Sequence, residues 1–168
     1  MTDTEKKKEN KPKKTAMEVA AQYLANRMRT IAEMRQHLKD KEFSEAEIDE
    51  TVNDLIGLRY LDDYAYALRY YEYNTAKHRG SKRAMRELEE KGIDKETIKF
   101  ALEDYIYEAK VDEFKMALEI AAKEAEEKEI DDKLIAKVAR KLDSRGYAQG
   151  DIIKVMSEMR RWDNSKLS

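Results

Sequence analysis

The chain has 168 residues, of which 42% are charged and 41% hydrophobic, and it contains five glycines and one proline. This composition favours helices and lacks the turn residues that an all-β fold requires, so we predict an all-α protein. The net charge of −2 means that any nucleic-acid contact depends on a local basic patch, and the absence of cysteine excludes disulfides, thiol catalysis and cysteine-ligated metals.

The first segment, residues 1–14, has no large apolar side chain after its initial methionine and carries six lysines against three acids. We predict a disordered basic tail, which either solubilises the protein or tethers it to nucleic acid. Ordered structure is expected from Thr15, because three capping boxes of the form S/T-x-x-E follow. The boxes are Thr15 with Glu18, Thr30 with Glu33, and Ser44 with Glu47.

One helical pattern occurs three times without a gap, at 31–55, 81–105 and 135–159. Gly92 and Gly146 stand where the first helix of a pair would end in the left-handed conformation. Each pair follows a further helix, and these helices are expected over 16–28, 63–77 and 109–127. The sequence predicts three tandem three-helix repeats stacked in an elongated curved array. The predicted repeats are 15–61, 62–108 and 109–162, with a C-terminal tail over 163–168.

Motifs of the common enzyme classes are absent from the sequence. The two histidines, His37 and His78, lie in different repeats, and there is no H-E-x-x-H, no phosphate-binding glycine loop and no G-x-S-x-G elbow. We therefore predict that the protein is not an enzyme and has no cofactor and no metal site. No apolar run has the length of a membrane span or the character of a signal peptide, so we expect a cytoplasmic protein without a membrane partner.

A purely cationic run surrounds a helix start expected at Gly80 and Ser81. Its members are Lys77, Arg79, Lys82, Arg83 and Arg86. The free amides and the dipole of a helix N-terminus favour an anion, so nucleic-acid phosphate and an acidic protein surface are both candidate ligands. The alternative is that these cations compensate acids elsewhere in the chain.

A cluster of tyrosines precedes this run. Tyr64 and Tyr71 are seven residues apart and are expected on the packed face, whereas Tyr66, Tyr70 and Tyr73 share another face. The latter three are possible interface aromatics, suited to protein contact or to base stacking. Packing between the repeats is the alternative explanation.

The acids are concentrated at the start of the third repeat, where residues 103–132 hold twelve acids against four lysines. We expect this stretch to be solvated and not to bind nucleic acid, because phosphate would be repelled. At the end of the last helix, Trp162 is expected to cover the core of the third repeat.

Several motifs after the first repeat follow each other in a specific order. The chain carries RYLDDYAYA at 59–67, a glycine at 80, Glu-Leu at 87–88 and a Lys-Gly-Ile corner at 91–93. In order and spacing these motifs resemble the RecX family. Two positions depart from the family pattern, since Arg59 and Glu42 stand where it usually has glycine.

The resemblance implies a curved arc of helical repeats that binds the RecA–DNA filament. Such a regulator modulates, and inhibits, recombinase and ATPase activity in recombinational DNA repair and the SOS response. The implied partners are the RecA filament and the DNA backbone, the five cations would contribute to filament binding, and we expect a monomer. The alternatives are a helical-repeat DNA-binding protein that acts without RecA and a generic protein-interaction scaffold.

The Tyr-Leu-Asp-Asp element also has a structural interpretation as the hinge between the first two repeats. Asp62 can cap the next helix, and Asp63 lies in the favourable first turn of that helix. Tyr60 and Leu61 are expected to wedge the two repeats together. We therefore predict an inter-repeat structural role for these four residues rather than a catalytic one.

Overall fold

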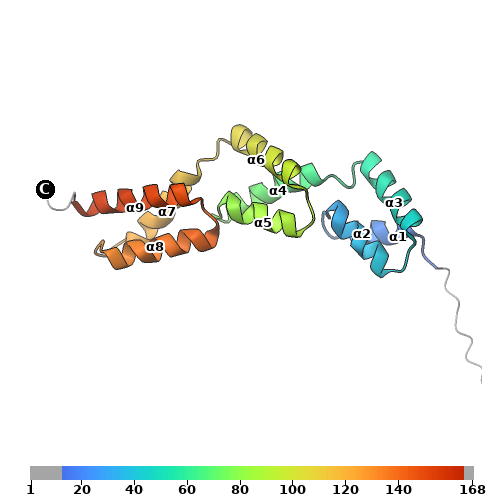
Figure 1. The fold of residues 1–168 in the computed structure, drawn as a ribbon, viewed down its shortest axis with the longest axis horizontal. Helices are drawn as coiled ribbons and strands as arrows, with labels where there is room; N and C mark the ends of the chain where they lie inside the picture. Colours follow the sequence, from blue (N-terminus) through green and yellow to red (C-terminus); the bar gives the residue numbers. More distant parts are fainter. Residues whose placement is uncertain (1–12, 165–168) are drawn as a thin grey trace, which may run out of the picture. The chain divides into compact units, whose positions relative to one another are not determined.

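The structure, a computed structural model, describes residues 13–164. These residues form nine helices and no strand (Figure 1), which confirms the all-α fold class. They group into two units, 13–29 with 34–61 and 30–33 with 62–164. The predicted basic tail lies outside the described residues except for its last two positions. The division into three repeats and their curved stacking stay predictions.

The first unit contains α1 (Ala16–Leu24), most of α2 (Ile31–Asp40) and α3 (Glu45–Gly57). Capping boxes begin α1 at Thr15 and α3 at Ser44, as predicted. Each box satisfies amides that a helix start leaves without an intrahelical partner. The buried apolar side chains of this unit include Ala20, Met34, Leu38, Ile48, Val52 and Leu55.

The second unit contains six helices in two groups (Figure 1). The first group is α4 (Asp63–Ala76), α5 (Ser81–Glu90) and α6 (Lys95–Ala109), and the second is α7 (Glu113–Ala125), α8 (Asp132–Arg145) and α9 (Gln149–Asn164). Within each group the three helices pack against one another. Tyr71, Leu88 and Ile98 are central in the first core, and Val138, Leu142, Tyr147 and Met159 in the second. Trp162 packs against the second core, as expected.

A left-handed residue follows the second helix of each predicted repeat. Glu42, Gly92 and Gly146 occupy equivalent positions and have φ angles of 64°, 83° and 84°. The corner geometry predicted for the two glycines is therefore confirmed, and Glu42 adopts it at a cost of roughly 1–2 kcal/mol that a glycine avoids. Arg59 also has a positive φ, of 60°. The two departures from the family pattern thus keep a backbone conformation that glycine adopts readily.

The helix predicted over 109–127 begins later than expected. Lys110 ends α6 in the left-handed conformation with φ 49°, and the Asp112 carboxylate caps α7 by accepting from the Lys115 N–H at 2.9 Å. Val111 continues the helical spacing of apolar residues across this break, so the spacing alone does not reveal where one helix ends and the next begins.

Two junctions within the second unit are built alike. The Thr30 hydroxyl donates to the Lys91 carbonyl at 2.7 Å, and at the equivalent position the Gly80 N–H donates to the Arg145 carbonyl at 3.0 Å. The start of α2 is thus hydrogen-bonded to the left-handed corner after α5, and the start of α5 is hydrogen-bonded in the same way to the corner after α8. In each case the two helices are equivalent members of successive predicted repeats. These contacts place the basic run at 77–86 beside the end of α8.

Candidate partner-binding surface

The cationic run occupies the end of α4 and the first two turns of α5. The Lys77, Lys82 and Arg86 side chains are exposed, whereas Arg79 and Arg83 are half-buried. The structure therefore brings the five predicted cations together on one segment. It does not present them equally to a partner.

Arg83 is compensated within the chain. Its Nε lies 2.8 Å from Glu87 Oε1, and the Tyr70 hydroxyl donates to the same carboxylate at 2.6 Å. Burial acts to raise the pKa of Glu87, but the hydrogen bonds from Tyr70 and Arg83 outweigh it and hold the pKa below its usual value of 4.5. For Arg83, therefore, the second interpretation holds: this cation neutralises an acid of the same chain.

The other four cations are not paired in this way, although the charge of Arg79 also lowers the pKa of Glu87. Within residues 13–164, Lys77, Arg79, Lys82 and Arg86 form no ion pair. Cations without an internal counterion are the ones available to an anionic partner.

The N-terminus of α5 is already occupied by an acid of the same chain. The Ser81 N–H donates to Glu113 Oε1 at 2.7 Å. Burial raises the pKa of Glu113, although the hydrogen bonds from Ser81 oppose this change. The prediction that this helix start binds an external anion is therefore wrong for the Ser81 amide.

The tyrosines divide differently from the prediction. Tyr66 is 9% exposed and lies in the core of its helix group, so its assignment as an interface aromatic is wrong. Tyr64 is 37% exposed and donates its hydroxyl to Asp104, which contradicts its placement on the packed face. Tyr71 is buried, as predicted.

Tyr73 is the accessible member of the predicted aromatic face. Its side chain is 49% exposed, and both Lys77 Nζ and Arg79 Cζ lie 5.9 Å from the centre of its ring. At this distance the cations are attracted to the ring face. Tyr70 is half-buried and committed to Glu87, so Tyr73 is the aromatic that a partner at the cationic run would contact.

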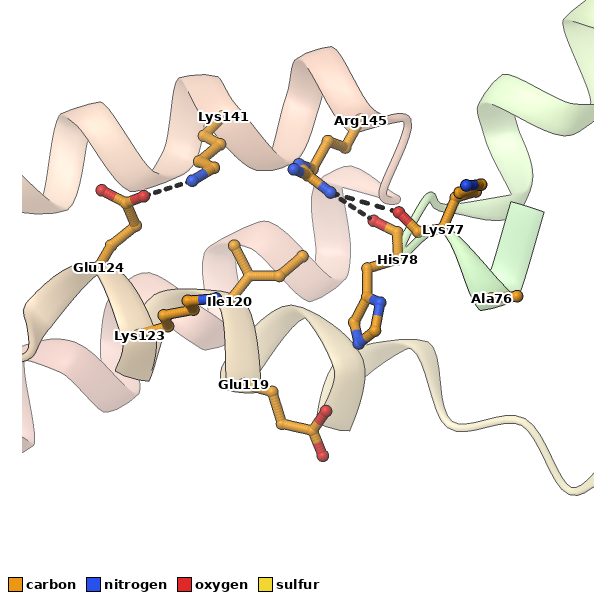
Figure 2. A pocket seen from close by; sticks show the side chains of 9 residues that line it. All are labelled: Ala76, Lys77, His78, Glu119, Ile120, Lys123, Glu124, Lys141 and Arg145. Atoms are coloured by element: carbon orange, nitrogen blue, oxygen red, sulfur yellow. Dashed lines mark hydrogen bonds and ion pairs between the residues drawn. The ribbon is translucent and has the colours of Figure 1, made fainter. Parts of the chain in front are cut away.

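A cleft of about 500 Å³ lies beside this run, between the end of α4 and helices α7 and α8. Figure 2 shows Arg145 reaching from α8 to the turn after α4, where its guanidinium donates to the carbonyls of Lys77 and His78 at 3.4 and 3.2 Å. Glu119, Lys123 and Glu124 line the cleft from α7, and Lys141 lines it from α8, where it contacts Glu124 (Figure 2). Cations therefore outnumber acids in this cleft.

Near the end of the acidic stretch over 103–132, Glu124 pairs with lysines instead of facing solvent. Glu124 accepts from Lys141 and lies 3.3 Å from Lys137 Nζ and 3.9 Å from Lys128 Nζ. Its hydrogen bonds with Lys141 and Lys137 lower its pKa to about 2. The expectation of a solvated carboxylate is therefore wrong for Glu124, whose side chain is 18% exposed.

The predicted hinge residues have distinct places. Tyr60 is 67% exposed and Leu61 is buried, and their role between the repeats stays a prediction. Asp62 caps α4 by accepting from the Ala65 N–H at 2.9 Å, as predicted. The Asp63 carboxylate accepts from the Ile31 N–H at 2.9 Å. This bond was not predicted. In the sequence it corresponds to an acid 32 residues after the first residue of a helix, and this spacing occurs twice, from 31 to 63 and from 81 to 113.

Residues 13–164 contain no group of three or more histidine, aspartate or glutamate side chains arranged to hold a metal ion. None of the helices in that range is both long and apolar enough to cross a bilayer.

Comparisons with known proteins find RecX proteins in both sequence and fold. A family model described as RecX, first three-helix domain, matches residues 16–55. The regulatory protein RecX of Halalkalibacterium halodurans is 36% identical over 102 residues, which cover 60% of this chain and 38% of that protein. The Bacillus subtilis protein of the same name is 38% identical over 90 residues, which cover 53% and 34% respectively. The chain thus spans less than two-fifths of these curated relatives.

The solved structures extend the similarity over more of the fold. The crystal structure of RecX from Lactobacillus salivarius superposes with a TM-score of 0.75 and 26% identity, covering 86% of this chain and 94% of that one. A second crystal structure, of a regulatory protein RecX, has a TM-score of 0.67 at 21% identity and supports the fold alone. The motifs, the matched first domain and the shared fold together show that the chain belongs to the RecX family.

Proposed function

We propose that this protein regulates RecA by binding the RecA–DNA filament and inhibiting its recombinase and ATPase activity. The observation that carries the proposal is the match to regulatory proteins named RecX, in sequence over 60% of the chain and in fold over 86% of it. The family resemblance supplies RecA as the partner. We place the protein accordingly in recombinational DNA repair and the SOS response, as a regulator rather than an enzyme.

The cationic run supports a contact with this filament. Lys77, Arg79, Lys82 and Arg86 form no ion pair within residues 13–164, and Lys77 and Arg79 lie over the exposed ring of Tyr73. A filament of protein on DNA offers both acidic side chains and phosphates to such a surface, and complementary charge mainly accelerates association. We assign these four cations to filament binding and leave Arg83 out, because Glu87 already neutralises it.

The direct test is the DNA-dependent ATPase rate of RecA with increasing amounts of the protein. We expect the rate to fall. A variant with Lys77, Arg79, Lys82 and Arg86 changed to alanine should require about tenfold more protein for half-maximal inhibition, equivalent to about 1.4 kcal/mol of binding free energy.

A matched control variant replaces four exposed cations outside the run. Lys39, Arg69, Lys95 and Lys115 are suitable, since they are exposed and form no ion pair within residues 13–164. The control changes the net charge equally and should inhibit like the wild type. An undisturbed ATPase rate with the wild-type protein would overturn the function, and equal inhibition by both variants would overturn only the assignment of the run.

A further inference from the structure

We propose that α8 carries a second nucleic-acid-binding patch, formed by Lys133, Lys137 and Arg140, which contacts the phosphodiester backbone. This α8 patch lies in the predicted third repeat, directly after the acidic stretch over 103–132 that we expected not to bind nucleic acid. The proposal concerns the protein's own affinity for nucleic acid and does not depend on RecA.

The α8 patch is equivalent in register to the cationic run. Lys133, Lys137 and Arg140 follow Arg79, Arg83 and Arg86 by the same 54 residues, the offset that relates the second and third copies of the repeat. A tandem array that presents cations at the same repeat positions can meet a polymer whose charge recurs along its length. Nucleic acid has this property because every nucleotide carries one phosphate.

The three side chains are exposed on one stripe of α8. They are spaced by four and three residues, which places them on a single helix face. At 1.5 Å per residue, the stripe from 133 to 140 is about 10 Å long. A DNA strand advances by about 3.4 Å per phosphate along its axis, so roughly three phosphates span the same length.

The counterions within the chain leave net positive charge at this face. Within residues 13–164, neither Lys133 nor Arg140 forms an ion pair. Lys137 shares the Glu124 carboxylate with Lys128 and Lys141. One carboxylate thus serves three ammonium groups, which leaves two positive charges in excess at this cluster.

A hollow of about 330 Å³ opens beside the α8 patch, and Lys128, Lys133, Lys137 and Arg140 line it. Asp131 and Glu129 are its two acids. The Asp131 carboxylate is occupied as the cap of α8, where it accepts from the Leu134 N–H at 2.7 Å. Even with both acids counted, the four cations are in excess. We therefore infer a polyanionic ligand, and the regular charge spacing favours nucleic acid over an acidic protein surface.

The test measures binding of the full chain to fluorescent oligothymidylate at several salt concentrations, without RecA. Changing Lys133, Lys137 and Arg140 to alanine should weaken binding about tenfold at about 50 mM salt. For a single strand each phosphate contact contributes about 0.7 to the slope of log K against log salt. The loss of three contacts should therefore reduce that slope by about 2.

Two control variants decide the interpretation. Changing Lys39, Lys95 and Lys115 to alanine alters the net charge equally and should leave binding unchanged. A second variant keeps the cations, with Lys133→Arg, Lys137→Arg and Arg140→Lys, and should bind like the wild type, which separates charge from folding.

Three outcomes would overturn the α8 patch. The first is wild-type binding to oligothymidylate that is too weak to detect at about 25 mM salt. The second is an equal loss of affinity in the alanine variant and in its matched control. The third is an alanine variant that no longer binds RecA filaments but keeps its affinity for bare DNA. The last result would indicate an acidic protein partner. ATPase inhibition without any DNA binding would leave the proposed function standing and remove only this inference.

Discussion

Glu113 accepts a hydrogen bond from the Ser81 backbone N–H at 2.7 Å, and the two residues are 32 positions apart. Asp63 accepts from the Ile31 N–H at 2.9 Å with the same separation. In both cases the preceding residue, Asp62 or Asp112, caps the helix that begins there. Each acidic pair therefore satisfies two helix starts, and the second acid links the second helix of one predicted repeat to the first helix of the next.

Replacing Glu113 should distinguish its hydrogen bond from its charge. In Glu113→Ala the Ser81 amide loses its partner at a half-buried position, and an unsatisfied group of this kind costs about 1–3 kcal/mol. In Glu113→Gln the amide oxygen can still accept. We expect urea unfolding at neutral pH to show a clear loss of stability for the alanine variant only. Equal losses in both variants would contradict a hydrogen-bonding role.

The pH dependence of Glu113→Gln has a defined sign. Burial raises the folded-state pKa of Glu113 above the value of 4.5 expected in the unfolded chain. Above pH 4.5 the unfolded state releases this proton before the folded state does, so the wild type loses stability until the pH passes the folded-state pKa. Glutamine does not ionise. The unfolding free energy of Glu113→Gln relative to the wild type should therefore increase over this window, and a constant difference would contradict the raised pKa.

Gly80 provides a test of the contact between the start of α5 and the corner after α8. A Cβ at position 80 would collide with the backbone of Gly146 and Tyr147. Gly80→Ala should therefore destabilise the protein by about 1–3 kcal/mol, the usual cost of overpacking. Gly150→Ala is the control, because a Cβ there meets nothing within 4 Å. It should leave the stability unchanged or raise it by up to about 1 kcal/mol. Similar thermal unfolding of the two variants would contradict the tight junction.

Local features of the fold could be predicted from the sequence. The capping boxes at Thr15 and Ser44 depend on residues three positions apart, and the left-handed corners at Gly92 and Gly146 depend on one residue each. Such signals do not require knowledge of the tertiary arrangement. The order of the helices could therefore be obtained without the structure.

The exposure of individual tyrosines could not be predicted in the same way. Helical spacing states which residues share a face, but it does not state how many faces are covered. Because α4 packs against both α5 and α6, Tyr66 and Tyr71 are both buried although they point in different directions. Tyr64, seven residues before Tyr71, lies at the start of the helix and stays exposed.

The balance of charge at the candidate surfaces also required the structure. Glu124 meets Lys137 and Lys141 only because α8 folds back against α7, which brings together residues 13 and 17 positions apart. A count of acids along the chain assigns this region a negative potential. In the folded protein, Lys137 and Lys141 of α8 pair with one of its carboxylates, Glu124.

Glu124→Gln should reveal this balance through stability. The hydrogen bonds with Lys141 and Lys137 lower the folded-state pKa to about 2, against 4.5 in the unfolded chain. A lowered pKa contributes stability that is fully present above pH 4.5 and is lost as the pH falls toward about 2. The variant should therefore melt at a lower temperature than the wild type at neutral pH, and the difference should shrink as the pH falls below 4.5. A difference that grows on acidification would exclude the lysine cluster as its cause.

The same substitution should strengthen nucleic-acid binding. Without the Glu124 carboxylate, Lys128, Lys137 and Lys141 have no shared counterion, and the positive potential beside the α8 patch increases. We expect about twofold to fivefold tighter binding of oligothymidylate, the effect of one solvent-screened charge. Glu50→Gln changes the net charge equally at an exposed position of α3 and should leave the affinity unchanged. Equal tightening by both variants would show that net charge alone controls binding, whereas tightening by Glu124→Gln alone would locate the ligand at α8.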